Sequence, residues 1–346
     1  MPKIKAKPSS IPKPQHTGTE RPEAIGTKGL PKPQRYWAVI AIILAISVSV
    51  MDASIANLAL PTISNDLGVP PHQSVWVVNA YLVTLIATTL PMSALGERIG
   101  FVSMFRSGIS IFMFGSIICA LSTNLPMLLT GRVINGLGGA VMMSIFGAMM
   151  RHIYPPREIA NGISINAMVV GTTAVLSPAL GAFIISIASW QWIFIIAIPL
   201  CILSLFFSHA LPKVARVTSP YDFKSAFLNI ITLGSFITGC DLVVSNTPVG
   251  IALLSLALIC GIILWRFSSR LEAPLFPVDL FRIPTFKYAV IVSALCFGAA
   301  ASAMLSLPFF YENTIGLATS TVGMLFMAWP VGSTLMARPA AYLSNK

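Results

Sequence analysis

The sequence predicts an all-α polytopic membrane protein, and three observations carry that prediction. Apolar residues make up 55% of the 346-residue chain and charged residues only 10%, with a mean hydropathy of +0.82. A soluble domain uses about 25% charged residues to cover its surface. The charges here fall in short blocks, and the apolar runs between them are long enough to cross ~30 Å of hydrocarbon as helices. The alternation of a membrane β-barrel is missing.

Ten apolar segments are the predicted transmembrane helices. Pro61 is expected to close the first, and Pro155 with Pro156 to separate the fourth from the fifth. Residues 1–35 are rich in Lys and Pro and lack an apolar run, so they are predicted to be a disordered basic cytosolic tail that can rest on anionic lipid, and not a cleaved signal peptide. The ten segments cover residues 37–61, 75–95, 107–123, 126–150, 160–187, 190–211, 226–244, 248–265, 288–311 and 320–342.

The basic residues predict the orientation. With the N-terminus in the cytosol, every Lys and Arg of the 22 except Arg132 falls in the tail or at an inner loop. The outer loops near 62–74, 124–125, 188–189, 245–247 and 312–319 hold none. This segregation is what the positive-inside rule gives for ten spans with both termini cytosolic, in a bacterial inner membrane. The net charge of +11 therefore indicates sidedness and not nucleic-acid binding.

An internal repeat suggests how the spans are grouped. Leu60-Pro61 and Leu307-Pro308 end the first and ninth spans, and Pro91 and Pro339 lie at the same offset in the second and tenth. Tandem helical repeats are characteristic of secondary transporters. We expect a six-helix bundle at 36–211, a two-helix linker at 212–266, and the first two helices of an incomplete C-terminal bundle at 267–346. Because four further helices would complete the repeat, the chain looks C-terminally truncated.

Asp52 and Arg132 are the ionisable residues placed deep in predicted spans. Asp52 lies roughly 13 Å and Arg132 roughly 10 Å below the outer ends of their helices, at 1.5 Å per residue. Charges in hydrocarbon are costly and are functional hypotheses by default, so a buried Asp52–Arg132 pair is predicted. Its carboxylate could take up a proton or meet a cationic ligand. A static pair that fixes helix packing is the alternative.

The other polar features are read as structural. Asp241 is expected to reach the water interface, the histidines form no proton relay, and the five cysteines lie in apolar spans without metal-ligand spacing. The glycine run Gly136–Ala140 suits close helix packing, and Pro178 marks a kink that is either passive or part of a gate. No catalytic, metal or nucleotide constellation is found, so the chain is predicted not to be an enzyme and to need no cofactor.

Four short motifs, Met51–Pro61, Gly96–Gly100, Leu129–Gly138 and Ser177–Gly181, resemble in order and spacing those of the major facilitator superfamily. Within it they are most similar to the 14-spanner drug:proton antiporters of the Emr/Qac type. The resemblance covers residues 36–346. The sequence departs from the family pattern at Glu97 for Asp, at Asn135 for Gln and at Ser177 for Gly.

The resemblance implies roles for specific residues. Asp52, Arg132 and Asn57 would serve proton coupling or substrate recognition. The residues with an implied gating or structural role are Gly96, Glu97, Arg98, Gly100, Gly136, Gly138, Pro178 and Gly181.

The function implied is proton-driven export of amphipathic or cationic drugs by alternating access. The partners would be those substrates, protons and membrane lipids, with accessory efflux subunits left open and no nucleic acid. A metabolite or solute carrier on the same fold is one alternative. A truncated product that does not transport by itself is another.

Overall fold

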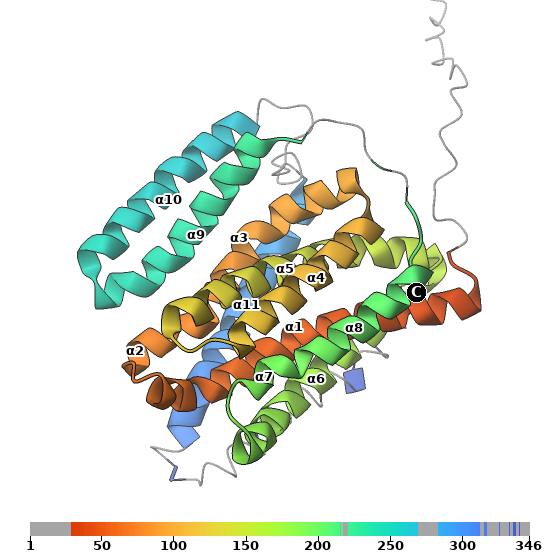
Figure 1. The fold of residues 1–346 in the computed structure, drawn as a ribbon. Helices are drawn as coiled ribbons and strands as arrows, with labels where there is room; N and C mark the ends of the chain where they lie inside the picture. Colours follow the sequence, from red (N-terminus) through yellow and green to blue (C-terminus); the bar gives the residue numbers. More distant parts are fainter. Residues whose placement is uncertain are drawn as a thin grey trace, which may run out of the picture.

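A computed structural model shows a protein made of helices (Figure 1). It describes residues 29–214, 216, 221–268 and 283–311, with a few isolated positions between 315 and 339. Within that part, eight helical units are long and apolar enough to cross a membrane. The elements are α1 Lys32–Asp66, α2 Pro71–Ser74, α3 Trp76–Ile99, α4 Phe101–Ala120, α5 Leu125–Ile153, η1 Pro156–Glu158, α6 Ile159–Ile187, α7 Trp192–Ile195, α8 Ala197–Phe207, η2 Ser208–Ala210, α9 Phe223–Ser245, α10 Thr247–Ser268 and α11 Pro284–Phe309.

Helices α1 to α8 pack into one bundle, in which α5 lies between α3 and α4, and α1 lies against α6 and α8. Glycines allow the closest of these approaches. A Cβ atom on Gly138 of α5 would lie 2.5 Å from the backbone nitrogen of Phe112 in α4, and one on Gly108 of α4 would lie 2.5 Å from Val141. Because lipid provides no hydrophobic force between helices, this close van der Waals packing helps to hold the bundle together, along with interhelical hydrogen bonds.

One residue, Gly100, joins α3 to α4. Its φ of 100° lies where a side chain is strained, and the chain reverses there with no further loop residues. Gly96, one turn before, is buried, and a Cβ on it would lie 3.0 Å from Ile145. The predicted inner-loop motif is therefore a tight turn between two packed helices.

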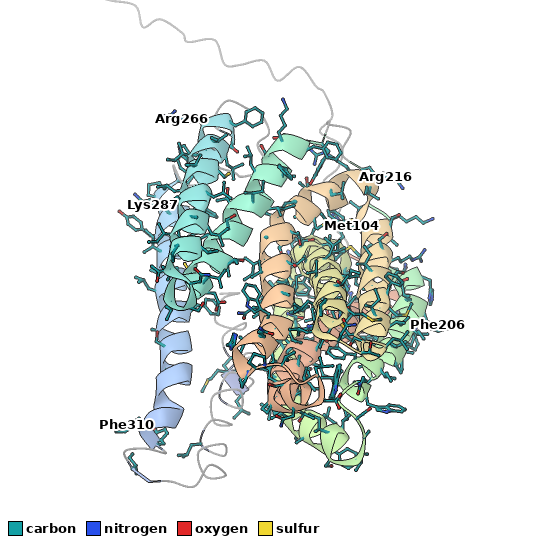
Figure 2. The ribbon with its side chains drawn as sticks, turned by 60° about the vertical axis from the view of Figure 1, so that its left-hand side comes forward. Met104, Phe206, Arg216, Arg266, Lys287 and Phe310 are labelled. Carbon is teal, nitrogen blue, oxygen red and sulfur yellow. The ribbon has the colours of Figure 1, made fainter. Side chains whose placement is uncertain are left out.

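Helices α9 and α10 form a hairpin beside the bundle, and α9 packs against α3 (Figure 1). Arg216 and Arg266 lie at the same end of the helices, and Phe310 lies at the opposite end (Figure 2). Two basic residues of predicted inner loops thus lie at one end of the helices, and the orientation in the membrane stays a prediction.

Nine of the predicted spans coincide with helices, and the tenth, at 320–342, falls almost wholly outside the described residues. The prediction that Pro61 closes the first span was wrong, because α1 continues through Pro61 to Asp66. Neighbouring helices in a membrane protein can compensate a proline inside a helix. The helix also begins at Lys32, within the predicted tail, whose residues 1–28 lie outside the described part.

The sixth span, expected as one segment at 190–211, is divided into α7, α8 and η2. Pro199 has no N–H to donate to the carbonyl of Ile195, the last residue of α7, so the helical pattern is interrupted there. Trp190, shortly before α7, is buried, and its indole Nε1 donates to Asp66 Oδ2 at the end of α1 at 2.7 Å.

Candidate functional site

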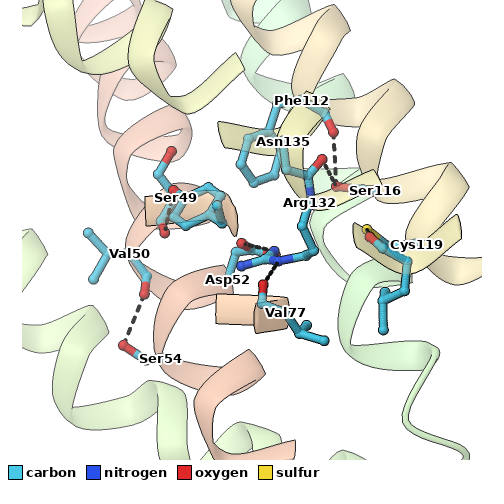
Figure 3. Close-up of polar contacts among 12 residues, drawn as sticks. Ser49, Val50, Asp52, Ser54, Val77, Phe112, Ser116, Cys119, Arg132 and Asn135 are labelled. Carbon is cyan, nitrogen blue, oxygen red and sulfur yellow. Dashed lines mark hydrogen bonds and ion pairs between the residues drawn. The ribbon is translucent and has the colours of Figure 1, made fainter. Parts of the chain in front are cut away.

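The predicted pair between Asp52 and Arg132 is present in the centre of the bundle (Figure 3). Asp52 comes from α1 and Arg132 from α5, and Arg132 Nη1 donates to Asp52 Oδ2 at 2.6 Å. The two residues are 4% and 0% exposed. A buried charge is tolerated when it is paired and hydrogen-bonded, so each residue offsets the desolvation cost of the other.

Three neighbours fix the guanidinium of Arg132. Its Nε donates to the backbone carbonyl of Val77 in α3 at 2.7 Å (Figure 3). Its Cζ lies 4.6 Å from the ring centroid of Tyr81 and 5.6 Å from that of Phe194. Aromatic faces attract a cation most strongly where water is excluded. The two rings therefore stabilise the charge of Arg132 in addition to its ion pair with Asp52.

The polar groups around the pair are incompletely matched. Ser49 Oγ, Asp52 Oδ1, Arg132 Nη2 and Asn135 Nδ2 are buried and have no hydrogen-bond partner among the described residues. Buried polar atoms are nearly always paired in native proteins, because leaving one unpaired costs free energy. Both partners of the ion pair thus have hydrogen-bonding capacity that no described group takes up.

Small residues bring the helices close enough to build this site. A Cβ on Gly136 of α5 would lie 2.6 Å from the carbonyl oxygen of Tyr81, so α3 and α5 touch backbone to backbone beside Arg132. The hydroxyl of Tyr81 reaches across to donate to the carbonyl of Ser49 in α1 at 3.3 Å. The glycine run is a packing device, as the sequence predicts.

Of the three residues predicted to act on substrate or proton, the structure does not bring Asn57 to the pair. Asn57 lies on α1 five positions beyond Asp52 and is exposed, whereas Asp52 is buried. Five residues correspond to about 500° of helical rotation, so the two side chains point to different faces. The structure therefore separates Asn57 from the Asp52–Arg132 site.

The remaining predicted residues lie at two other places. Pro178 and Gly181 are in α6, which runs on through the proline, and a Cβ on Gly181 would lie 2.9 Å from Ile55 of α1. Arg98 donates to the carbonyl of Ala94 at 2.6 Å and lies near the tight turn at Gly100, while Glu97 there is exposed. These residues shape helix contacts and the turn and do not touch Asp52.

Sequence reasoning missed Tyr81 and the carbonyl of Val77 as parts of the site. A tyrosine in an apolar run and a backbone carbonyl carry no sign of which helix they face. Asp241 is exposed on α9, and its place at the water interface stays a prediction. Within the described ranges, no group of three or more His, Cys, Asp or Glu side chains could hold a metal ion.

Comparison with known proteins places these features in a family. The sequence profile described as Major Facilitator Superfamily matches residues 42–346. The chain is 39% identical over 323 residues to the "Uncharacterized transporter YebQ" of Escherichia coli (strain K12), covering 92% of this chain and 71% of that protein. It is 28% identical over 320 residues to the "Riboflavin transporter RibZ" of Clostridioides difficile (strain 630), covering 90% and 69%.

A third relative is the "Probable multidrug resistance protein EmrY" of Escherichia coli (strain K12), 27% identical over 322 residues and covering 88% of this chain. The match spans 62% of that protein, less than two thirds of its length. Among solved structures, the proton:xylose symporter XylE superposes with a TM-score of 0.61 at 12% identity, over 90% of this chain and 70% of that one. The human organic anion transporter MFSD10 superposes with a TM-score of 0.55 at 13% identity, over 89% and 72%. These structures share the fold.

Proposed function

The chain belongs to the major facilitator superfamily of membrane transporters, and on that premise we propose that it exports amphipathic or cationic compounds across a bacterial inner membrane in exchange for protons. Export would proceed by alternating access. The proton gradient would supply the energy, with no cofactor. Relatives named as multidrug resistance proteins support this reading.

The observation that carries the proposal is the buried Asp52–Arg132 pair. Among the described residues, Asp52 is the acidic side chain buried within a membrane-spanning helix. A carboxylate that changes between charged and neutral forms changes its attraction to Arg132, which stays protonated at every accessible pH. Proton uptake by Asp52 would therefore loosen the tie between α1 and α5. A cationic substrate that pairs with the carboxylate in place of the proton would release that proton again.

The surface between α3 and α5 fits an amphipathic compound. A hollow of about 480 Å³ is lined there mainly by apolar side chains, with hydroxyls from Thr89, Ser93 and Ser144. Binding sites for such compounds are typically apolar with a few placed polar groups. The lining contains no charged side chain.

The test is substrate accumulation in inverted membrane vesicles energised by a proton gradient, with a panel of quaternary ammonium dyes. We expect Asp52→Asn to abolish accumulation, because the amide cannot exchange a proton. Asp241→Asn is the matched control, since Asp241 is an exposed carboxylate in another span, and it should transport normally. Unchanged transport in Asp52→Asn would contradict the proposal that Asp52 couples transport to protons.

A metabolite carrier is the second candidate, and one observation favours it. The relative named as a riboflavin transporter is as similar to this chain as the relative named as a multidrug resistance protein, at 28% against 27% identity. Vesicles that take up a neutral heterocyclic metabolite but none of the dyes would favour this candidate.

A further inference from the structure

A proline in α3 leaves one backbone carbonyl without its helical donor. Pro91 lies inside α3 and has no N–H, so the carbonyl of Ala87, four residues earlier, cannot form its normal bond. Ala87 is 2% exposed, which keeps water from replacing that donor. In a membrane such a carbonyl must be satisfied by a neighbouring group.

Asn229 of α9 supplies the missing donor. Its Nδ2 donates to the carbonyl oxygen of Ala87 at 3.0 Å, and the two residues are 142 positions apart in the chain. Asn229 is 2% exposed, within a span whose other buried residues are small. An amide at this depth is costly unless it is paired, so the bond specifies where α9 docks on α3.

The segment before α9 is fixed to the same part of α3. The hydroxyl of Tyr221 donates to the carbonyl of Pro91 at 3.2 Å, and the guanidinium of Arg98 lies 5.4 Å from the centroid of the Tyr221 ring. Burial raises the pKa of Tyr221, so its hydroxyl keeps the proton that it donates. Asp222 then caps α9 by accepting from the backbone nitrogen of Ser225 at 3.1 Å.

Helix α3 is thus held on two sides. At Ala87 it accepts from α9, and at Val77 it accepts from Arg132 of α5. Figure 1 shows the α9–α10 hairpin flanking α3 on the side away from α1. Helix α3 therefore connects the bond from α9 to the carbonyl that accepts from the buried arginine.

We propose that Asn229 is a positioning residue. It binds α3 at the carbonyl freed by Pro91, and through this bond the α9–α10 hairpin contributes to the function of the bundle. The hairpin sets the position of α3 against Arg132. The transport half of this inference rests on the function proposed above, whereas the docking half does not.

The test is a double-mutant cycle on the chain in detergent micelles, read by denaturant unfolding. Asn229→Leu removes the donor, and Pro91→Ala returns an N–H to α3, so Ala87 no longer needs Asn229. We expect Asn229→Leu to lower the ratio of folded to unfolded protein about three- to tenfold when Pro91 is present. In the Pro91→Ala background the same change should have an effect of less than about twofold.

The matched control is Thr232→Val, one turn further along α9. Its hydroxyl is buried and has no partner among the described residues, so removing it should not lower the folding ratio. Equal losses from Asn229→Leu in both backgrounds would overturn the docking. If Asn229→Leu cannot be purified, recovery of folded protein in the double variant supports the proposal, and failure to recover it overturns the proposal.

Transport separates positioning from mere stability. In vesicles matched for folded protein, Asn229→Leu should lower the maximal export rate without changing KM. Adding Pro91→Ala should not restore that rate, because the bond from α9 to α3 is still missing. An unchanged rate in Asn229→Leu would overturn the positioning role. If the wild-type chain exports none of the dyes, the proposed function fails, while the unfolding cycle still decides the docking.

Discussion

Removing one partner of the buried pair should cost far more than removing both. Asp52 and Arg132 are 4% and 0% exposed, and their polar atoms meet at 2.6 Å. Removing one partner of such a pair typically lowers the free energy of unfolding by about 3–5 kcal/mol, because it leaves an uncompensated buried charge. Replacing both with apolar residues of similar volume is often close to neutral.

The two single variants should differ. Asp52→Leu leaves a guanidinium that cannot lose its proton, so we expect the full loss of about 3–5 kcal/mol in the free energy of unfolding. Arg132→Met leaves a carboxylate that can escape by taking up a proton. Its loss should be smaller and should shrink further as the pH is lowered, because the neutral acid is tolerated better in an apolar site.

The free energy of unfolding of the double variant Asp52→Leu with Arg132→Met should lie within about 1–2 kcal/mol of the wild-type value. The remaining losses are the bond to Val77 and the contacts with the aromatic rings. The assay is equilibrium unfolding in detergent micelles at several pH values. A loss in the double variant equal to the sum of the two single-variant losses would show that the two residues do not compensate each other. Transport then separates the two roles of the pair: a static tie predicts a transporting double variant, whereas proton coupling predicts a stable one that does not transport.

Two predictions concern the packing and the turn. Gly138→Ala should destabilise the chain by about 1–3 kcal/mol, because its Cβ would lie 2.5 Å from the backbone nitrogen of Phe112. Gly147→Ala in the same helix meets nothing within 4 Å and should be neutral or stabilising by up to about 1 kcal/mol. Equal unfolding midpoints for these two variants would contradict the packing account. Gly100→Ala should cost about 1–3 kcal/mol, because φ is 100° there, and an unchanged unfolding free energy would show that the turn relaxes freely.

The helices and the ion pair follow from the sequence for one physical reason. In hydrocarbon, a long apolar run forms a helix, and opposite charges buried at similar depth are expected to pair. The prediction of the Asp52–Arg132 pair needed no more than the position of each residue along its span. The placement of Asn57 on another face of α1 also follows from helical geometry, but the motif grouped it with Asp52.

Other features depend on tertiary contacts that no local pattern records. Pro61 and Pro91 lie inside continuous helices, whereas Pro199 coincides with an interruption, although all three are prolines in apolar runs. A neighbouring group can satisfy the carbonyl that a proline frees. For Pro91 that group is Asn229, and only the fold shows that the two are adjacent.

The most direct measurement of the central claim is proton release when substrate is added to the purified chain in weakly buffered detergent solution, followed with a pH-sensitive dye. The account predicts release from wild type and from Asp241→Asn, and none from Asp52→Asn. Undiminished release from Asp52→Asn would contradict the claim that this carboxylate carries the exchanged proton.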